Sequence, residues 1–97
     1  MTDTTRRIIE QILAVPRGKV CSYGGIAAKA GLPNGARQVV RVLHSMSEKH
    51  ALPWHRIIRA DGRIALEGEG RALQITLLRG EGVNVSKEGT VIAPEWA

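Results

Sequence analysis

Apolar residues near the N-terminus of the chain repeat at the period of an α-helix. Four of them share one face of a predicted first helix: Ile8, Ile9, Ile12 and Leu13. Thr4 or Thr5 can cap the start of this helix, and the Pro-Arg-Gly-Lys turn at 16–19 ends it. We therefore expect a structural helix that packs this face on the core.

The next segment predicts two helices joined by a tight turn, over about residues 22–46. Ser22 caps a short helix over 23–30, which stops at the Gly-Leu-Pro turn of 31–33. Asn34 caps a second helix that runs to the end of the segment. This order of elements is a helix-turn-helix, which many small helical domains contain without any nucleic-acid role.

The second helix of this pair has an apolar side and a basic side. Its apolar side is formed by Val39, Val40, Leu43 and Met46. Arg37, Arg41 and His44 follow i, i+4, i+7 spacing on another side, which we expect to be exposed. Gly35 and Ala36 at the helix start are small enough for a close approach to phosphates, and a helix N-terminus favours an anion. We therefore expect this helix to contact DNA.

The distribution of charge supports a nucleic-acid partner. The 97-residue chain has a net charge of +5, and between Pro16 and Ala60 eight Lys and Arg residues stand against one acid, Glu48, which leaves that segment at +7. A basic segment on a near-neutral body is typical of polyanion binding, because each neutralised phosphate releases a condensed counterion. A generic basic surface that serves solubility is the alternative that charge leaves open.

Length and composition predict a single domain over 1–97. No apolar run is long enough to span a bilayer, and no apolar signal core follows the first residues, so we expect a cytoplasmic protein without membrane contact. The lone cysteine, Cys21, excludes an internal disulfide framework and a cysteine-based zinc cluster. His44, His50 and His55 have no zinc-site spacing, so we expect neither a metal nor a cofactor.

The C-terminal half predicts a β-hairpin and one more helix. Asp-Gly at 61–62 is a hairpin turn signal between strands at 57–58 and 64–66. The fold class is therefore mostly α with a small β-hairpin. The segments that follow are an acidic loop at 67–70, a helix over 71–79, and a tail, 83–97, which has a hairpin-like pair around 87–89 and which we expect to be mobile.

The segment Pro53-Trp54-His55-Arg56 places a large aromatic side chain between a rigid proline and two polar residues. The proline favours an extended conformation for the residue before it, so Trp54 is expected at a junction between a loop and a strand. Trp54 can form the wall of a pocket or belong to the core, and the residues by themselves leave both open.

Residues 53–58, Pro-Trp-His-Arg-Ile-Ile, resemble the active-site signature Pro-Cys-His-Arg-Val-(Val/Ile) of the O6-alkylguanine-DNA alkyltransferases, with Trp54 in place of the acceptor cysteine. This replacement is the mark of the alkyltransferase-like proteins, which cannot accept an alkyl group. Three more stretches are similar to the family: 15–27 to Ile-Pro-x-Gly-x-Val-x-Ser-Tyr-Gly-x-Ile-Ala, 36–40 to Ala-Arg-x-Val-Gly, and 77–82 to Leu-Leu-x-x-Glu-Gly.

The resemblance implies a winged-helix-like helix-turn-helix architecture that binds the minor groove of duplex DNA. Gly35 and Ala36 would lie against the groove floor, and Arg37 would enter the duplex and fill the space left by a flipped nucleotide. Tyr23 would crowd the 3′ phosphate and help to rotate the nucleotide, while Arg41 on the basic side adds a DNA contact. A simple phosphate contact for Arg37 and a half-buried packing role for Tyr23 remain open.

The resemblance also implies a lesion pocket and a relay. The pocket residues are Pro53, Trp54, His55 and Arg56. In the enzymes a Glu-His-water-Cys relay generates the reactive thiolate; His55 and Glu81 match its first two members, and Trp54 stands at the last. An indole has no lone pair suited to displacement, so we expect no transferase activity and a structural His55–Glu81 pair.

Three other positions bear on the resemblance. Cys21 is not expected to replace the acceptor, because a lone cysteine without a positioned base is usually a small buried hydrophobe and its sequence position is far from His55 and Glu81. Met46 stands where the enzymes carry an asparagine, and Glu67 where they carry a lesion-contacting tyrosine. We therefore expect a less enclosed pocket.

These observations together imply a non-catalytic DNA-damage recognition protein. It would bind O6-alkylguanine in duplex DNA, flip the nucleotide into the pocket and flag it for nucleotide excision repair proteins of the UvrA type, acting as a monomer associated with the nucleoid. Three alternatives stay open: a helix-turn-helix regulator that reads sequence in the major groove, a non-specific DNA binder, and a residual alkyltransferase enzyme.

Overall fold

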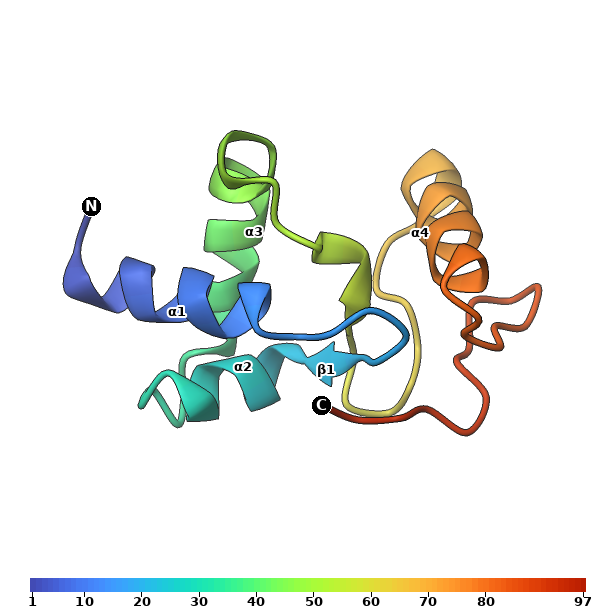
Figure 1. Ribbon diagram of the computed structural model, residues 1–97, viewed down its shortest axis with the longest axis horizontal. Helices are drawn as coiled ribbons and strands as arrows, with labels where there is room; N and C mark the ends of the chain where they lie inside the picture. Colours follow the sequence, from blue (N-terminus) through green and yellow to red (C-terminus); the bar gives the residue numbers. More distant parts are fainter.

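Four α-helices are the main elements of the chain in the computed structural model, which describes residues 1–97 (Figure 1). The elements in chain order are α1 (Asp3–Leu13), β1 (Cys21–Ser22), α2 (Tyr23–Lys29), α3 (Ala36–His50), the short 3-10 helix η1 (Trp54–Arg56), β2 (Ile57–Ile58) and α4 (Gly68–Gly80). The prediction of a mostly helical domain is confirmed. None of the helices is long and apolar enough to cross a membrane.

The only sheet is parallel, and it joins two halves of the core. β1 and β2 pair in the register Cys21↔Ile57 and Ser22↔Ile58. Cys21 and Ile57 pack among α1, α2 and α3, whereas Ile58 and Val20 pack with α4 and the C-terminal tail. Because neighbouring strand residues point to opposite sides, this short sheet belongs to both clusters.

The N-terminal helix is as predicted except at its ends. Thr2, not Thr4 or Thr5, is the N-cap, and its hydroxyl accepts a hydrogen bond from the backbone N–H of Thr5 at 3.1 Å. The three isoleucines of the predicted face are buried, but Leu13 is 52% exposed because it lies in the last turn of the helix, beyond that packed face.

The helix-turn-helix is present, with α2 capped by Ser22 as predicted. Asn34 is not the cap of α3, because Gly35 takes that place and donates its N–H to the carbonyl of Leu32. A Cβ added to Gly35 would stand 2.7 Å from Cβ of Leu32. This contact requires a glycine, so Gly35 is there to let the turn fold closely onto itself.

The second helix of the pair is longer than predicted and faces differently. It continues past Met46 to His50, and Ala51 ends it in the left-handed conformation with φ of 50°. The predicted polar connector is therefore helical as far as His50, because the hydroxyls of Ser45 and Ser47 donate to carbonyls one turn earlier and leave the helix backbone intact.

The burial pattern of α3 also corrects the sequence prediction. Val39 and Val42 are its buried residues, whereas Val40 is 37% exposed and Leu43 and Met46 are only partly buried. The helix packs on α1 and α2 by one side alone. Leu43 and Met46 pack against the edge of this core, and Val40 lies outside it.

The predicted β-hairpin is only a turn. Gly62, with φ of 85°, closes the turn after Arg59, and the Asp61 carboxylate accepts the backbone N–H of Arg63. Ile58 instead pairs with β1, and Ile64 donates its N–H to the carbonyl of Gly89. The pairing partners are distant in sequence, so a local turn signal does not identify them.

The C-terminal third is more regular than predicted. α4 begins at Gly68, so most of the expected acidic loop forms its first turn. The tail folds back on the core rather than extending freely: Val85 and Val91 are buried and bridge each other around the predicted turn near 87–89. Trp96 ends beside β1, where Val20 exchanges hydrogen bonds with Glu95 and Ala97 (Figure 1).

Candidate nucleic-acid interface

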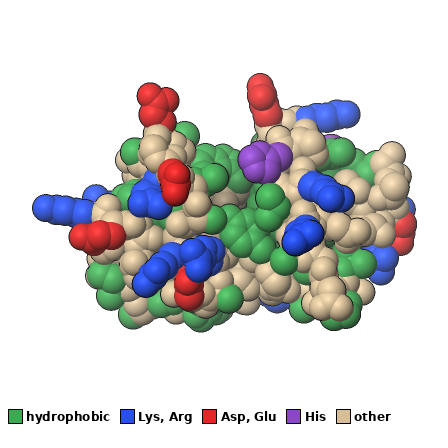
Figure 2. All heavy atoms as spheres, turned by 180° about the vertical axis from the view of Figure 1, so that it is seen from behind, with side chains coloured by type: hydrophobic (Ala, Val, Ile, Leu, Met, Phe, Trp, Pro, Cys, Tyr) green, Lys and Arg blue, Asp and Glu red, His purple; other side chains and the backbone are tan.

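A cavity of about 370 Å³ lies between α3 and α4, and Trp54 of η1 forms part of its wall. Val40 on α3 and Leu73 on α4 are both exposed apolar residues in its wall, so the cavity opens to solvent between these two helices. Figure 2 shows a face with apolar side chains gathered at its centre and Lys and Arg side chains on either side. The lining residues are Tyr23, Val40, Leu43, His44, Ser47, Trp54, Leu66, Gly70, Leu73 and Gln74.

Trp54 is held in the cavity wall by two consecutive tight turns. Pro53 has φ of −76° and ψ of 63°, and the N–H of Trp54 donates to the carbonyl of Leu52 at 2.8 Å, which is an inverse γ-turn. The 3-10 helix follows, in which Arg56 donates its N–H to the carbonyl of Pro53. Trp54 therefore lies in a tight turn directly before β2, at the junction between loop and strand predicted from sequence, and it belongs to neither core cluster.

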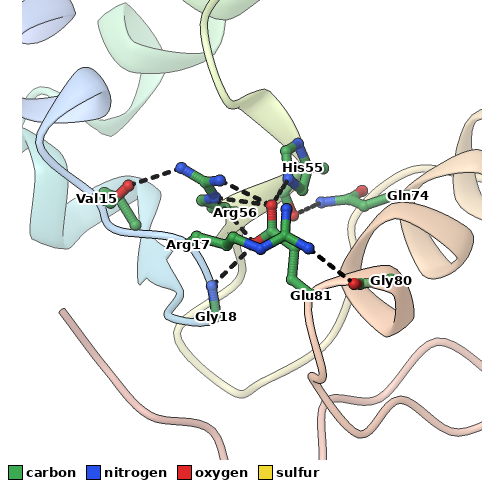
Figure 3. A network of polar contacts seen from close by, with 8 residues as sticks. All are labelled: Val15, Arg17, Gly18, His55, Arg56, Gln74, Gly80 and Glu81. Carbon is green, nitrogen blue, oxygen red and sulfur yellow. Dashed lines mark hydrogen bonds and ion pairs between the residues drawn. The ribbon is translucent and has the colours of Figure 1, made fainter.

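The other three residues of the predicted lesion pocket do not line the cavity. Pro53 shapes the turn, while His55 and Arg56 point to the opposite side of η1 and contact Glu81 at the end of α4 (Figure 3). The indole of Trp54 and the imidazole of His55 are nearly perpendicular, at 87° with 6.1 Å between ring centroids. Within this one turn, the Trp54 side chain therefore lines the cavity, whereas the side chains of His55 and Arg56 belong to a polar cluster.

Glu81 is the centre of this polar cluster. Its carboxylate accepts hydrogen bonds from Nε2 of His55 at 2.7 Å, from Nη2 of Arg56 at 2.8 Å and from the backbone N–H of Gly18 at 3.0 Å. Arg56 also donates to the carbonyl of Val15 at 3.0 Å, and Arg17 donates to the carbonyl of Gly80 at 3.1 Å. The cluster therefore ties together the loop after α1, η1 and the end of α4 (Figure 3).

The electrostatics of Glu81 favour the charged carboxylate. Its side chain is only 6% exposed, and this burial opposes ionisation. The hydrogen bonds from Arg56, Gly18 and His55 outweigh the burial and lower the pKa of Glu81 from 4.5 to about 2. Because a carboxylate only accepts hydrogen bonds, Nε2 of His55 must carry the proton that it donates.

Gln74 on α4 is the main residue that sequence reasoning missed. It is 2% exposed, and its amide Nε2 donates to the carbonyls of His55 at 3.0 Å and Ile57 at 3.1 Å (Figure 3). The signal was present in the sequence, because Gln74 lies one turn before Leu78 and so on the apolar side of its helix. A glutamine on a buried helix face needs polar partners, which here are supplied by the backbone of η1 and β2.

The predicted DNA-contacting residues differ in exposure and surroundings. Arg37 is exposed and makes no hydrogen bond or ion pair within the chain, whereas Arg41 borders a separate hollow of about 410 Å³ between α1 and α3. Ala36 is half-buried, and Gly35 is buried against Leu32, which is not the open groove-facing position implied by the resemblance.

Tyr23 and His44 both border the cavity. Both lie in its lining, and burial raises the pKa of the Tyr23 hydroxyl. Arg37, Arg41 and His44 are all exposed on α3, as predicted, and His44 lies where this basic side meets the cavity.

The remaining candidate residues have structural surroundings. Cys21 is 3% exposed in β1, and strand pairing sets it opposite Ile57, so it is near the central motif in space despite its distance in sequence. Met46 packs against the core of the helix-turn-helix, and Glu67 is exposed before α4. No group of three or more His, Cys, Asp or Glu side chains lies close enough together to hold a metal ion.

Comparison with known proteins identifies relatives of this arrangement. Residues 3–83 match the family described as the DNA-binding domain of 6-O-methylguanine DNA methyltransferase. The DNA base-flipping protein of Escherichia coli is 41% identical over 86 residues, which cover 89% of this chain and 67% of that protein. Alkyltransferase-like protein 1 of Schizosaccharomyces pombe is 32% identical over 87 residues, which cover 88% of this chain and 81% of that protein.

Solved structures match over the same region. S. pombe Atl1 in complex with damaged DNA containing O6-carboxymethylguanine superposes with a TM-score of 0.82 and 28% identity, covering all of this chain and 97% of Atl1. The Mycobacterium tuberculosis OGT in complex with DNA gives a TM-score of 0.69 and 32% identity, covering 84% of this chain and 50% of OGT. The chain therefore belongs to the 6-O-methylguanine DNA methyltransferase DNA-binding family, as one of its alkyltransferase-like members.

Proposed function

We propose that this protein recognises O6-alkylated guanine in duplex DNA, flips the nucleotide into the cavity between α3 and α4, and leaves the alkyl group in place. One observation carries the proposal: Trp54 lines this cavity at the motif position where the enzymes have their acceptor cysteine. A cavity of about 370 Å³ falls within the roughly 300–1,000 Å³ that is usual for small-molecule sites.

The chemistry of the site supports recognition without transfer. An indole nitrogen is a donor only, and it has no lone pair with which to displace an alkyl group. Cys21 is packed in the core, where a thiol has no access to a substrate in the cavity. Glu81 and His55 remain hydrogen-bonded as in a relay, but Arg56 shares the carboxylate and the pair has no nucleophile to activate.

Flipping would be carried out by Arg37 and Tyr23. Arg37 is exposed at the start of α3 with no partner in the chain, so its guanidinium can enter the duplex without loss of an internal contact. A planar guanidinium can replace part of the stacking and hydrogen bonding lost when a base leaves the helix. Tyr23 lies in the cavity wall and can guide the rotating nucleotide. The DNA base-flipping protein of E. coli and the complex of S. pombe Atl1 with damaged DNA support base flipping as the activity of this chain.

In this proposal the recognised lesion is passed to other proteins. Because the chain keeps no acceptor for the alkyl group, repair requires partners that remove the damaged strand, and nucleotide excision repair, to which damage sensors of the UvrA type belong, has this capacity. We place the protein in the cytoplasm, on the nucleoid, as a monomer that bends and marks the damaged site. Affinity would come largely from the basic segment, and it would fall with rising salt concentration.

The decisive experiment is one incubation with two readouts. A duplex with a single O6-methylguanine and its unmodified twin are each incubated with the protein, scored for binding, and then analysed for protein mass and lesion content. We expect tighter binding to the lesion, no gain of methyl mass and no loss of lesion. A methyl gain would point to a residual alkyltransferase. Equal binding to both duplexes would leave a non-specific binder, and dependence on sequence rather than on the lesion would indicate a regulator.

A further inference from the structure

We propose that Gln74 reads the exocyclic 2-amine of the flipped guanine through its side-chain oxygen Oε1. This inference rests on the proposed function, because it needs the base to occupy the cavity between α3 and α4. It assigns a specificity role to a residue of α4 that lies outside the Pro-Trp-His-Arg motif and outside the helix-turn-helix.

The orientation of the Gln74 amide is fixed by its surroundings. Nε2 donates both of its hydrogens, to the carbonyls of His55 and Ile57, and the reversed amide would set an oxygen against two oxygens. Oε1 is therefore an acceptor held in one position by η1 and β2.

The oxygen itself has no partner in the chain. No hydrogen bond to Oε1 of Gln74 exists among the side-chain contacts, although the residue is 98% buried. Nε2 of His50 is the only fully enclosed side-chain nitrogen or oxygen that has no hydrogen-bond partner. Because Oε1 of Gln74 also has no partner, it is not fully enclosed and keeps some accessible surface. Since Gln74 lines the cavity, this surface faces the cavity. A buried acceptor without a donor costs free energy unless a ligand or water supplies one.

The chemistry of O6-alkylguanine matches a single fixed acceptor. Alkylation of O6 removes the proton from N1, so the 2-amine is the only hydrogen-bond donor that the base edge retains. The apolar side chains that make up most of the lining, among them Leu66 and Leu73, suit the rest of the base and the alkyl group. Unmodified guanine also carries N1–H, a second donor that one fixed acceptor cannot satisfy.

Other polar groups in the lining are less suited to this role. Ser47 donates its hydroxyl hydrogen to the carbonyl of Leu43 at 2.6 Å, and Trp54 offers only an N–H donor. Tyr23 and His44 lie on α2 and α3, and no hydrogen bond within the chain fixes the position of either side chain. Gln74 is the acceptor whose position is determined by two hydrogen bonds to the motif itself.

The test is a cycle of two bases and two proteins. The bases are O6-methylguanine and O6-methylhypoxanthine, which lacks only the 2-amine, each in the same duplex opposite the same base. The variant is Gln74→Lys, since an ammonium group can donate to the carbonyls of His55 and Ile57 but cannot accept a hydrogen bond. Thr76→Lys, at an exposed position of the same helix, adds the same charge and serves as the control.

For each protein we take the ratio of its affinities for the O6-methylguanine and the O6-methylhypoxanthine duplex. This ratio should be at least threefold larger for the unaltered protein and for Thr76→Lys than for Gln74→Lys, which is the effect expected of one hydrogen bond. Because all the proteins meet the same duplexes, any change in base pairing caused by the missing amine cancels when their ratios are compared. A difference between the ratios below threefold would overturn the role of Gln74 while leaving lesion recognition intact. Equal binding of the unaltered protein to lesion and unmodified duplex would overturn the proposed function, and this inference with it.

Thermal unfolding first establishes that Gln74→Lys is folded. If it is not, single-stranded oligonucleotides with the two bases decide the question for the unaltered protein, because no opposite base is present to pair with the lesion. At least threefold tighter binding of O6-methylguanine is then expected, and a smaller preference contradicts the assignment.

Discussion

Acid should weaken the fold through Glu81. Its carboxylate is charged and held by Arg56, His55 and the backbone of Gly18, so the folded protein lowers its pKa from 4.5 to about 2. A depressed pKa means that the stabilisation is fully present above the unfolded value of 4.5 and is lost as the pH falls toward 2. From this shift, the free energy of unfolding should lose about 2 kcal/mol between pH 7 and pH 3 through this group alone.

The measurement is urea unfolding of the protein and of Glu81→Gln at a series of pH values from 7 to 3. The variant removes the titrating group while every other carboxylate is kept, so the difference between the two proteins isolates Glu81. At pH 7 the variant should be less stable by about 3 kcal/mol, because Arg56 is left without its buried partner. That difference should narrow by about 2 kcal/mol at pH 3. A difference that stays constant over this range would show that the network does not depend on the charge of Glu81.

Three other substitutions test the site and the turn that carries it. Arg37→Ala should reduce lesion binding and flipping, followed with a fluorescent base reporter, whereas Lys29→Ala should affect only salt-sensitive affinity; unchanged flipping would remove the intercalating role of Arg37. Trp54→Ala should reduce discrimination for the alkylated base in a binding assay while the variant stays folded, since Trp54 lies outside both core clusters. Gly35→Ala should lower the free energy of unfolding by about 1–3 kcal/mol in urea, because the added methyl would stand 2.7 Å from Leu32; an unchanged midpoint would show that the turn can relax.

The sequence predicts local features of this fold well and distant pairings poorly. Helical periodicity and the Ser22 cap identify α1 and α2, because both signals act within a few residues. The partner of β2 is β1, more than thirty residues away, and the Asp-Gly turn at 61–62 suggested a nearer one. The end of α3 was missed because the serines near it bond back along the helix instead of interrupting it.

The candidate site shows the same division. Trp54 and Tyr23 could be found from sequence because the motifs that contain them resemble a known family. For Gln74 the sequence signals only burial, on the apolar side of α4. The place of Gln74, Leu66 and Leu73 in the cavity wall could not be predicted, since it depends on how α4 packs beside η1. The side of α3 that faces the cavity was likewise assigned to the core, as an apolar stripe does not reveal whether it contacts protein or an open pocket.

The geometry of η1 explains how the motif can lose its nucleophile and keep its architecture. Trp54 faces the cavity, whereas His55 and Arg56 on the same turn hold Glu81 and the loop after α1. The hydrogen bonds that fix the turn therefore do not pass through the side chain at position 54. A residue there can change from a reactive thiol to a flat apolar surface without disturbing the support beneath it. The relay residues then still position the wall of the cavity, which is a sufficient reason to keep them in a protein that, as we propose, performs no transfer.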